Sequence, residues 1–547
     1  MQRLQEVANR RRQSFGSVSP KSCTAALGLF VLASVSVGST AIAQNRELQK
    51  PPSDKVLRVA PPASCESMAN LKLRDTVITT AQSVPAGSFS PPSGATLTGL
   101  PDFCRVAGVI YPAIRFEVWL PAFTWNWKFL MVGGGGTQGS LGYSAVAAAL
   151  QRGYASATTD TGHSSADATF SWMTLPGTFN DWAFRGTHET AVKAKAVIAS
   201  YFGDGPRRAY FQGCSGGGQQ AMTEVQRTND FDGVIAGAPA FNWGPLMAGE
   251  LSNNIALRKT DPAGVFPTAK LTLVNNAALD ACDAADGLKD GVIQDPRTCN
   301  FDPTVLLCTA ADAADCLTAP QVAAVKRTYQ GAMNPRTGEQ IYPGLMPGGE
   351  PLWTPLNSGS VPFGSNYAYY RFGVFEDPNW DYTTFDFDAD YAYARGKLGT
   401  LDSSFDPDLR DFRDRGAKLI MYHGWSDYFL APMNTVTYYG NVVDGIAADM
   451  KNGGDAVQET QKFARLFMVP GMGHCSGGPG TDQFDFLNAL EQWVERGIAP
   501  DRIIASHRTS GVVDKTRPLC PHPQVARYSG TGDVSLASSF VCAAGPL

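Results

Sequence analysis

Two short glycine-rich segments carry residues suited to nucleophilic chemistry. Residues 213–217 read Gly-Cys-Ser-Gly-Gly, and residues 471–475 read Gly-Met-Gly-His-Cys. A serine hydroxyl becomes an effective nucleophile when a base accepts its proton, and histidine is the usual base. We therefore interpret Ser215 as a candidate nucleophile and His474 as its base, in an acyl-transfer reaction that passes through a covalent intermediate on the serine.

The carboxylate that orients such a histidine is expected just past the end of a buried strand. Residues 419–422 are apolar and suit that strand, and the sequence His-Gly-Trp-Ser-Asp that follows them ends at Asp427. Ser215, Asp427 and His474 then occur in the chain order of α/β-hydrolases. His423, which opens that sequence, is interpreted as a hydrogen-bonded scaffold residue.

The elements needed to position the serine are predicted around it. Residues 208–212 have the pattern of a strand, and residues 219–225 have that of a helix, which we expect to begin near Gly217. The order strand, sharp turn, serine, helix is what a nucleophile elbow requires, because its glycines leave room where neighbouring segments approach closely. His474 likewise lies between an apolar strand at 466–469 and a helix at 484–495. The sequence therefore predicts the α/β-hydrolase fold.

Before residue 125 the mature chain reads as loops and antiparallel strands.

A run of four glycines, residues 133–136, follows the apolar strand pattern of residues 128–132. Backbone N–H groups that stabilise an oxyanion need room for the substrate, and glycine leaves that room. We expect one oxyanion donor from this run, assigned to Gly135, and the second from the N–H of Gly216, directly after the serine.

The same run leaves an alternative open. Gly134, Gly136 and Gly139 also spell G-x-G-x-x-G between a strand and a helix, and Asp160 follows about 20 residues on, as in a dinucleotide-binding site. An NAD-dependent oxidoreductase is therefore the second hypothesis, although it leaves the serine and histidine segments without a role. A third hypothesis is a non-catalytic exported binding protein, which would not react with a fluorophosphonate probe.

The N-terminal residues predict export. Three arginines at 10–12 precede an uncharged stretch at 23–38 and then small residues, which is the order of a secretory signal. We expect cleavage near Ala43, so that residues 1–43 are a signal peptide and the mature protein is periplasmic or secreted.

Ten of the eleven cysteines lie in the mature chain. An even number in an exported chain favours disulfides over free thiols or metal ligands. A bond between Cys214 and Cys475 would keep their Cα atoms within about 7 Å and so hold the candidate serine beside its histidine. Spacing favours four further pairs, although other connectivities stay open: Cys65–Cys104, Cys282–Cys299, Cys308–Cys316 and Cys520–Cys542.

Length and composition predict two domains. The chain has 547 residues, of which 44% are hydrophobic and 17% charged, so it can bury a large core. We expect residues 44–240 and 413–547 to form the catalytic domain. Residues 241–412, a long insertion rich in Pro, Asp and aromatic residues, are expected to form a lid domain.

A net charge of −5 without clustered Lys or Arg after the signal favours no nucleic-acid partner. No later stretch predicts a membrane span.

Several lid residues are candidates for contact with a substrate. Five aromatic side chains could line a pocket for an aromatic acyl group, although each alone also fits a lid core: Trp353, Tyr369, Tyr370, Phe372 and Trp380. Arg371 among them is a candidate partner for a substrate carboxylate.

An acidic loop within the lid predicts a metal site. Residues 282–292 place three carboxylates in one glycine-containing turn. Oxygen ligands at this density suit Ca²⁺, with backbone carbonyls completing the shell, because like charges this close repel unless a cation offsets them. The spacing differs from that of an EF-hand and no Glu closes the loop. We expect the ion to have a structural role.

Together these features resemble the tannase and feruloyl esterase family of exported α/β-hydrolases. The resemblance covers most of the mature chain and is carried by G-C-S-x-G-G at residues 213–218, H-G-x-x-D ending at Asp427, G-M-G-H-C ending at Cys475, and the acidic loop. It implies a Cys214–Cys475 disulfide and a small aromatic ester as substrate, of the feruloyl, galloyl or mono-terephthalate type. It also implies structural calcium held by five residues: Asp283, Asp286 and Asp290 through carboxylates, and Leu288 and Val292 through carbonyls. The resemblance does not extend to the lid residues that select among acids.

Overall fold

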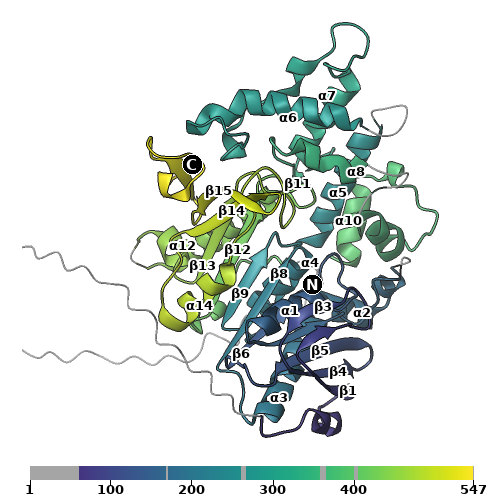
Figure 1. The fold of residues 1–547 in the computed structure, drawn as a ribbon. Coiled ribbons are helices and arrows are strands. Elements are labelled where there is room, and N and C mark those ends of the chain that lie inside the picture. The colour runs from purple at the N-terminus through teal and green to yellow at the C-terminus, as the bar shows by residue number, and fades with distance from the viewer. Residues whose placement is uncertain are drawn as a thin grey trace, which may run out of the picture. The chain divides into compact units, whose positions relative to one another are not determined.

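The computed structural model describes residues 61–167, 170–259, 266–357, 362, 365–399, 404–451 and 453–545. The predicted signal peptide lies outside these residues. The central sheet is built from β1 (Thr76–Val84), β4 (Phe103–Ile110), β5 (Ile114–Pro121), β6 (Lys128–Val132), β7 (Ala155–Thr159), β8 (Arg208–Cys214), β9 (Gly233–Gly237), β12 (Lys418–Gly424) and β13 (Ala464–Val469). Their order in the sheet is β1-β4-β5-β7-β6-β8-β9-β12-β13 (Figure 1).

The sheet is mixed. In this order across the sheet, neighbouring strands from β1 to β7 pair antiparallel. Neighbouring strands from β7 through β6 to β13 pair parallel. Parallel neighbours require crossover connections, and helix α1 (Tyr143–Gln151) supplies one between β6 and β7. The antiparallel strands expected near the N-terminus are confirmed, and they form one side of the same sheet.

Helices cover both faces of the sheet, because successive side chains of a strand point to opposite faces. In β8, Ala209 and Phe211 pack in the core shared with α3 (Gly186–Phe202), α4 (Gly216–Arg227) and α12 (Pro432–Asp449). Tyr210, between them, packs in the core shared with α1 and α14 (Phe486–Arg496). Burial on both faces explains why the parallel strands read as continuous apolar runs.

Between β9 and β12 the described chain adds no strand to the central sheet. It forms α5 (Trp243–Lys259), α6 (Thr268–Cys282), α7 (Ala319–Gln330), α8 (Thr354–Asn357), α9 (Ser365–Ala368), α10 (Ala389–Lys397), α11 (Arg410–Asp414) and a hairpin of β10 (Gly331–Met333) with β11 (Gln340–Pro343). Most of these elements share a separate hydrophobic core that includes Trp243, Val325 and Tyr369. Figure 1 shows their helices, in teal and green, beyond one end of the strands.

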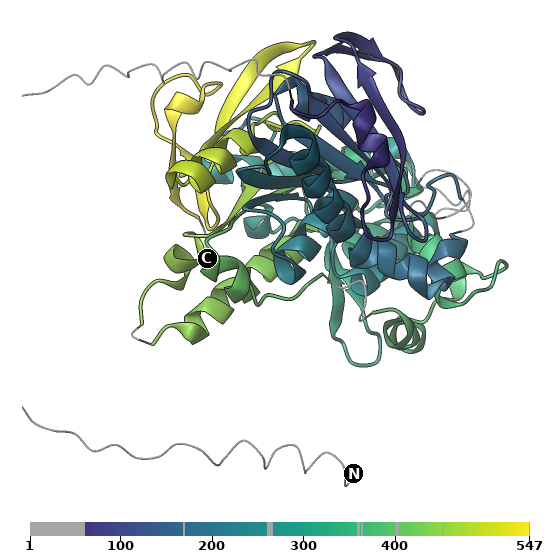
Figure 2. The ribbon, with the colours of Figure 1, turned by 90° about the horizontal axis from the view of Figure 1, so that it is seen from below.

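The C-terminal residues form two hairpins, β14 (Ile503–Thr509) with β15 (Val512–Leu519) and β16 (Gln524–Tyr528) with β17 (Phe540–Ala544). In Figure 2 these yellow hairpins and the purple N-terminal strands lie on two sides of the sheet. The remaining strands and α-helices of the described residues are β2 (Gly87–Phe89), β3 (Leu97–Leu100), α2 (Pro176–Asn180) and α13 (Ala456–Thr460), and short 3-10 and π-helical turns connect several elements. Across the described ranges, no helix has the length and apolar character needed to cross a membrane.

The five predicted disulfides are confirmed: Cys65–Cys104, Cys214–Cys475, Cys282–Cys299, Cys308–Cys316 and Cys520–Cys542. The Cys214–Cys475 bond spans 261 residues of sequence, the longest of these separations. It joins the end of β8 to the loop after β13, which are the two places where the sequence predicts the nucleophile and its base.

Candidate active site

The loops that carry the predicted site residues leave the sheet at one edge. β6, β8, β12 and β13 run parallel, with β9 between β8 and β12, so their carboxyl ends lie at the same edge. Ser215 directly follows β8, and residues 133–136 directly follow β6. Asp427 and His474 lie in the loops after β12 and β13.

Ser215 occupies the sharp turn between β8 and α4. Its φ of 62° and ψ of −122° lie outside the regions that L-residues usually adopt. Its backbone N–H donates to the carbonyl of Gly237 at 3.0 Å, which fixes the turn against the end of β9. A side chain on Gly213 would overlap the backbone of Gly217. The predicted elbow is therefore present, and its glycines allow α4 to approach the strand.

The three predicted side chains form one hydrogen-bonded chain. The hydroxyl of Ser215 donates to Nε2 of His474 at 2.8 Å, and Nδ1 of His474 donates to Oδ2 of Asp427 at 2.8 Å. An ionised carboxylate only accepts hydrogen bonds, so the proton of neutral His474 lies on Nδ1 and Nε2 accepts. The neighbouring Cys214–Cys475 bond holds its Cα atoms 6.2 Å apart.

Asp427 is buried, with an exposed fraction of 1%, and both of its oxygens are engaged. Oδ1 accepts the backbone N–H groups of Phe429 at 2.9 Å and Leu430 at 3.0 Å. Burial alone would raise the pKa of Asp427, but the charge of His474 and hydrogen bonds from two histidines lower it overall. Burial also opposes protonation of His474, yet the charge of Asp427 raises the pKa of His474 overall. Ionised Asp427 can thus stabilise the imidazolium that forms when Ser215 loses its proton.

The second histidine on Asp427 is His423. Its Nε2 lies 3.1 Å from Oδ2 of Asp427 and 3.0 Å from the carbonyl oxygen of Leu430, and its Nδ1 lies 2.8 Å from Oγ1 of Thr435. The scaffold interpretation correctly predicted a hydrogen-bonded ring but missed the contact with Asp427. The four-residue spacing of the two side chains across the turn after β12 was the available signal.

Backbone hydrogen bonds narrow the choice of oxyanion donor in the glycine run. The N–H of Gly133 donates to the backbone of β8 at 2.9 Å, and the N–H of Gly134 donates to Oε1 of Gln220 at 2.8 Å. Among the described residues, the N–H groups of Gly135 and Gly136 have no such acceptor. Gly216 opens α4, where backbone N–H groups have no partner within the helix. Gly135 and Gly216 therefore stay the predicted donors.

Gln138 lies against this glycine run, and nothing in the sequence pointed to it. Its φ is 63°, its exposed fraction is 3%, and neither amide atom of its side chain has a hydrogen-bond partner within the described ranges. An added Cβ on Gly216 would overlap the carbonyl of Gly136 and lie 2.6 Å from Nε2 of Gln138. Residue 216 must therefore be glycine for the run to pack against the elbow.

The insertion between β9 and β12 packs beside the site. Its hydrophobic core contacts Cys214, Cys475 and Phe429. The ring of Phe429 lies 5.1 Å from that of His474, edge to face. Three of the predicted pocket aromatics are buried in this core: Trp353, Tyr369 and Tyr370. The other two are partly exposed: Phe372 and Trp380.

Arg371 lies in a helical turn formed by residues Tyr369–Val374. Its guanidinium carbon lies 5.2 Å from the ring centre of Tyr367 and 5.1 Å from that of Phe372. Its Nε is buried, and it has no hydrogen-bond partner among the residues that the structure describes. The side chain therefore keeps an unused donor in an aromatic environment.

The acidic residue of the dinucleotide alternative is engaged within the fold. Asp160 has an exposed fraction of 1%, and its Oδ1 accepts the N–H groups of Arg115 at 2.8 Å and Gly162 at 2.9 Å. Its Oδ2 pairs with the guanidinium of Arg115. The carboxylate that would bind a ribose is thus part of the scaffold, which argues against the oxidoreductase hypothesis.

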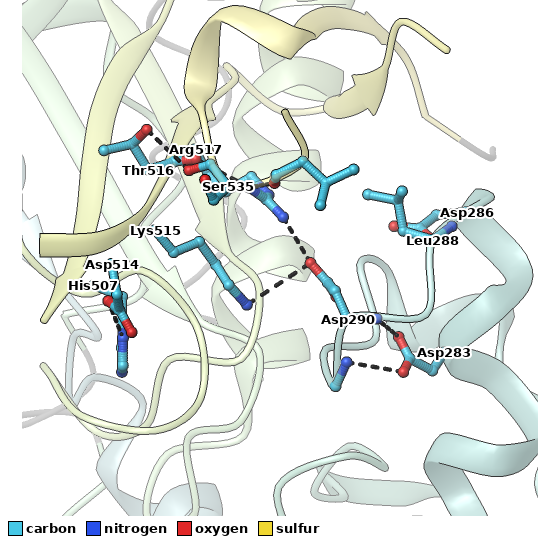
Figure 3. Close-up of polar contacts among 12 residues, drawn as sticks. Asp283, Asp286, Leu288, Asp290, His507, Asp514, Lys515, Thr516, Arg517 and Ser535 are labelled. Atoms are coloured by element: carbon cyan, nitrogen blue, oxygen red, sulfur yellow. Dashed lines mark hydrogen bonds and ion pairs between the residues drawn. The ribbon is translucent and has the colours of Figure 1, made fainter. Parts of the chain in front are cut away.

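The predicted calcium ligands lie in one loop, but their carboxylates do not converge (Figure 3). Asp283 accepts the N–H groups of Asp290 at 3.2 Å and Gly291 at 2.9 Å, and Asp286 accepts that of Leu288 at 2.9 Å. The carboxylate of Asp290 instead points to the C-terminal hairpin. There it lies 2.7 Å from the guanidinium of Arg517 and 3.8 Å from Nζ of Lys515. Composition predicted the oxygen-rich loop, but not this ion pair.

Known proteins match the chain over most of its length. A profile described as "Tannase and feruloyl esterase" matches residues 97–543. An uncharacterised esterase of Xanthomonas campestris pv. campestris is 40% identical, over 88% of this chain and 92% of its own. The mono(2-hydroxyethyl) terephthalate hydrolase of Piscinibacter sakaiensis is 36% identical, over 85% of this chain and 88% of its own.

Solved structures agree with this relationship. Feruloyl esterase B from Aspergillus oryzae superimposes with a TM-score of 0.81 at 30% identity, covering 88% of this chain and 99% of its own. Tannin acyl hydrolase from Aspergillus niger shares the fold, with a TM-score of 0.72 at 22% identity, covering 86% of this chain and 92% of its own. The predicted α/β-hydrolase fold is confirmed. The chain therefore belongs to the tannase and feruloyl esterase family of carboxylic ester hydrolases.

Proposed function

We propose that this protein hydrolyses esters of aromatic acids with Ser215 as nucleophile, His474 as general base and acid, and Asp427 as the carboxylate that orients His474. The observation that carries the proposal is the continuous chain of two 2.8 Å hydrogen bonds from Ser215 through His474 to Asp427. Family membership supplies the reaction, and these three side chains are arranged to perform it.

The reaction consists of two acyl transfers. Oγ of Ser215 attacks the ester carbonyl while Nε2 of His474 accepts its proton, and the N–H groups of Gly135 and Gly216 stabilise the charge on the carbonyl oxygen. His474 gives that proton to the leaving alcohol as the ester bond breaks. Water then attacks the acyl-enzyme and loses a proton to His474, which returns a proton to Ser215 as the acid leaves.

The substrate class is proposed from the relatives and from the insertion. Feruloyl esterase B and the mono(2-hydroxyethyl) terephthalate hydrolase are named for esters of aromatic acids. Residues 241–412 would act as the lid beside residues 44–240 and 413–547, because their core meets the Cys214–Cys475 bond next to the serine. Arg371 is the candidate partner for a free carboxylate on the acyl group. Five disulfides support export after cleavage near Ala43.

A panel of esters tests the substrate class. We expect kcat/KM for at least one of methyl ferulate, methyl gallate and mono(2-hydroxyethyl) terephthalate to exceed that for methyl butyrate by about 100-fold, because burying an aromatic ring contributes roughly 3 kcal/mol. Product chromatography measures each rate. Faster turnover of the alkyl ester would remove the aromatic substrate class while leaving ester hydrolysis intact.

The variant Arg371→Gln separates the charged substrate from the neutral ones. Loss of a hydrogen bond to a charged group should lower kcat/KM for the terephthalate monoester by about 10-fold or more. Methyl ferulate, whose acyl group carries no carboxylate, serves as the matched substrate and should be unaffected. Equal losses for both esters would assign Arg371 a purely structural role.

We further propose a structural Ca²⁺ in the acidic loop, held by carboxylates of Asp283, Asp286 and Asp290 and by the carbonyls of Leu288 and Val292. Oxygen-only donors suit this ion. Burial and the charges of its two acidic neighbours raise the pKa of Asp286, and a cation would relieve that repulsion. To bind Ca²⁺, the carboxylate of Asp290 would have to leave its ion pair with the C-terminal hairpin and turn toward the metal.

Chelation tests the calcium proposal. Because a ligand that binds only the folded state stabilises it, removal of Ca²⁺ should lower the Tm by on the order of 3 °C. Asp283→Asn should abolish this response, whereas Asp280→Asn, an exposed acid just before the loop, should retain it. Differential scanning fluorimetry and elemental analysis measure both. An unchanged melting curve together with a metal-free protein would reject the site.

A further inference from the structure

His423 is buried at the end of β12, with an exposed fraction of 1%. Its Nε2 faces two acceptors, Oδ2 of Asp427 at 3.1 Å and the carbonyl oxygen of Leu430 at 3.0 Å. Neither can donate, so Nε2 must carry a proton that the two acceptors share. In the neutral ring Nδ1 then accepts from the hydroxyl of Thr435 at 2.8 Å. The surroundings thus select one tautomer of His423.

This tautomer completes the hydrogen bonding of Asp427. Two backbone N–H groups donate to Oδ1. Among the described residues, Oδ2 accepts hydrogen bonds only from the side chains of His423 and His474. His474 has to exchange protons with Ser215 during the reaction. The bond from His423 is therefore the contact to Oδ2 that does not change during turnover.

We propose that His423 is a positioning residue, whose Nε2–H fixes Oδ2 of Asp427 and thereby orients His474, with Thr435 fixing the tautomer of His423. The proposal rests on the proposed function, since it assigns His423 a role only if Asp427 and His474 act on Ser215. The backbone hydrogen bonds hold Oδ1 of Asp427 in place. The imidazole of His423 then prevents the carboxylate from rotating about Oδ1.

Removal of the imidazole tests this role. In His423→Leu the carboxylate can rotate away from His474, and we expect kcat to fall by about 100-fold with KM unchanged, the loss typical of a misplaced catalytic group. In His423→Gln the amide nitrogen can reach the position of Nε2 and offers two N–H donors. It should therefore recover most of the rate. Thr435→Val keeps the imidazole of His423 but removes the hydroxyl that selects its tautomer. It should therefore lower kcat less than His423→Leu does.

The pH dependence of kcat/KM provides a readout that a structural role would not move. A weaker bond from Asp427 lowers the pKa of His474, so the acidic limb should shift to lower pH in His423→Leu. Besides Ser215, the titratable groups that face His474 in the described structure are Asp427, Glu250 of α5 and Tyr428. Glu250 is buried, accepts from Asn366 at 3.0 Å and has a pKa raised to about 7 by burial. Each pH profile of kcat/KM is therefore also measured in protein that carries Glu250→Gln as a second substitution.

Leu490→Ala is the matched control for lost stability, because Leu490 is fully buried in α14, in the core shared with α1 and Tyr210 of β8. It should lower the Tm and leave kcat and the acidic limb unchanged. The proposal is overturned if His423→Leu behaves like this control, if its acidic limb stays in place or rises, or if His423→Gln is as slow as His423→Leu. An active Ser215→Ala would instead overturn the proposed function itself.

Discussion

Replacing Ser215 with alanine should leave a folded protein that has lost about 10⁶-fold in kcat, the scale of loss when the nucleophile of a serine triad is removed. The hydroxyl is the only group deleted, and Cβ stays at the turn between β8 and α4. Circular dichroism and the Tm should therefore match those of the parent. Release of acid from the preferred aromatic ester measures the rate.

A second buried serine supplies the control. Ser156 lies in β7 with an exposed fraction of 0%, and its hydroxyl donates to the carbonyl of Leu130 at 2.8 Å. Ser156→Ala removes the same atom from a strand of the central sheet, away from the elbow, so kcat should change little. Turnover by Ser215→Ala at a rate close to that of Ser156→Ala would contradict the role of Ser215 as nucleophile.

The double variant Cys214→Ala and Cys475→Ala should lose activity and stability together. The bond closes a separation of 261 residues, for which the chain-entropy description gives about 5.5 kcal/mol of stabilisation. It also joins the segments that carry Ser215 and His474. A displacement of about 1 Å between these two side chains would lower kcat by about 100-fold.

The matched control removes Cys308–Cys316 in the insertion. This bond closes only 8 residues, so its loss should cost about half as much free energy of unfolding and should not affect kcat. Urea unfolding and initial rates measure both quantities. Full activity in a Cys214→Ala, Cys475→Ala protein that is still folded would show that the disulfide does not hold the serine beside its base.

Local pattern was sufficient to locate the strand ends and therefore to place the candidate site residues at one edge of the sheet. The apolar runs that became β6, β8, β12 and β13 are buried on both faces, which makes them readable without long-range information. The start of α4 shows the limit. The helical run itself can be read only over 219–225, and its start is expected near Gly217, whereas α4 begins at Gly216, because consecutive glycines have low helix propensity and the packing of the elbow starts the helix there.

Contacts between distant residues could not be predicted in this way. The pairing of Asp290 with Arg517 joins positions 227 apart in the chain, and it redirects a carboxylate that composition alone assigns to a metal. The hydrogen bond from Gly134 to Gln220 joins the glycine run after β6 to helix α4 and removes one candidate oxyanion donor. Both depend on how separate elements pack, which periodicity and spacing do not report.

The most direct test of the central claim is a non-reducing peptide map after reaction with a fluorophosphonate. The proposed function predicts one phosphonyl group, on Ser215, within a peptide that is still linked through Cys214 to the peptide containing Cys475 and His474. Labelling should be absent in Ser215→Ala. A phosphonyl group on another residue, or no label on a protein that hydrolyses esters, would contradict it.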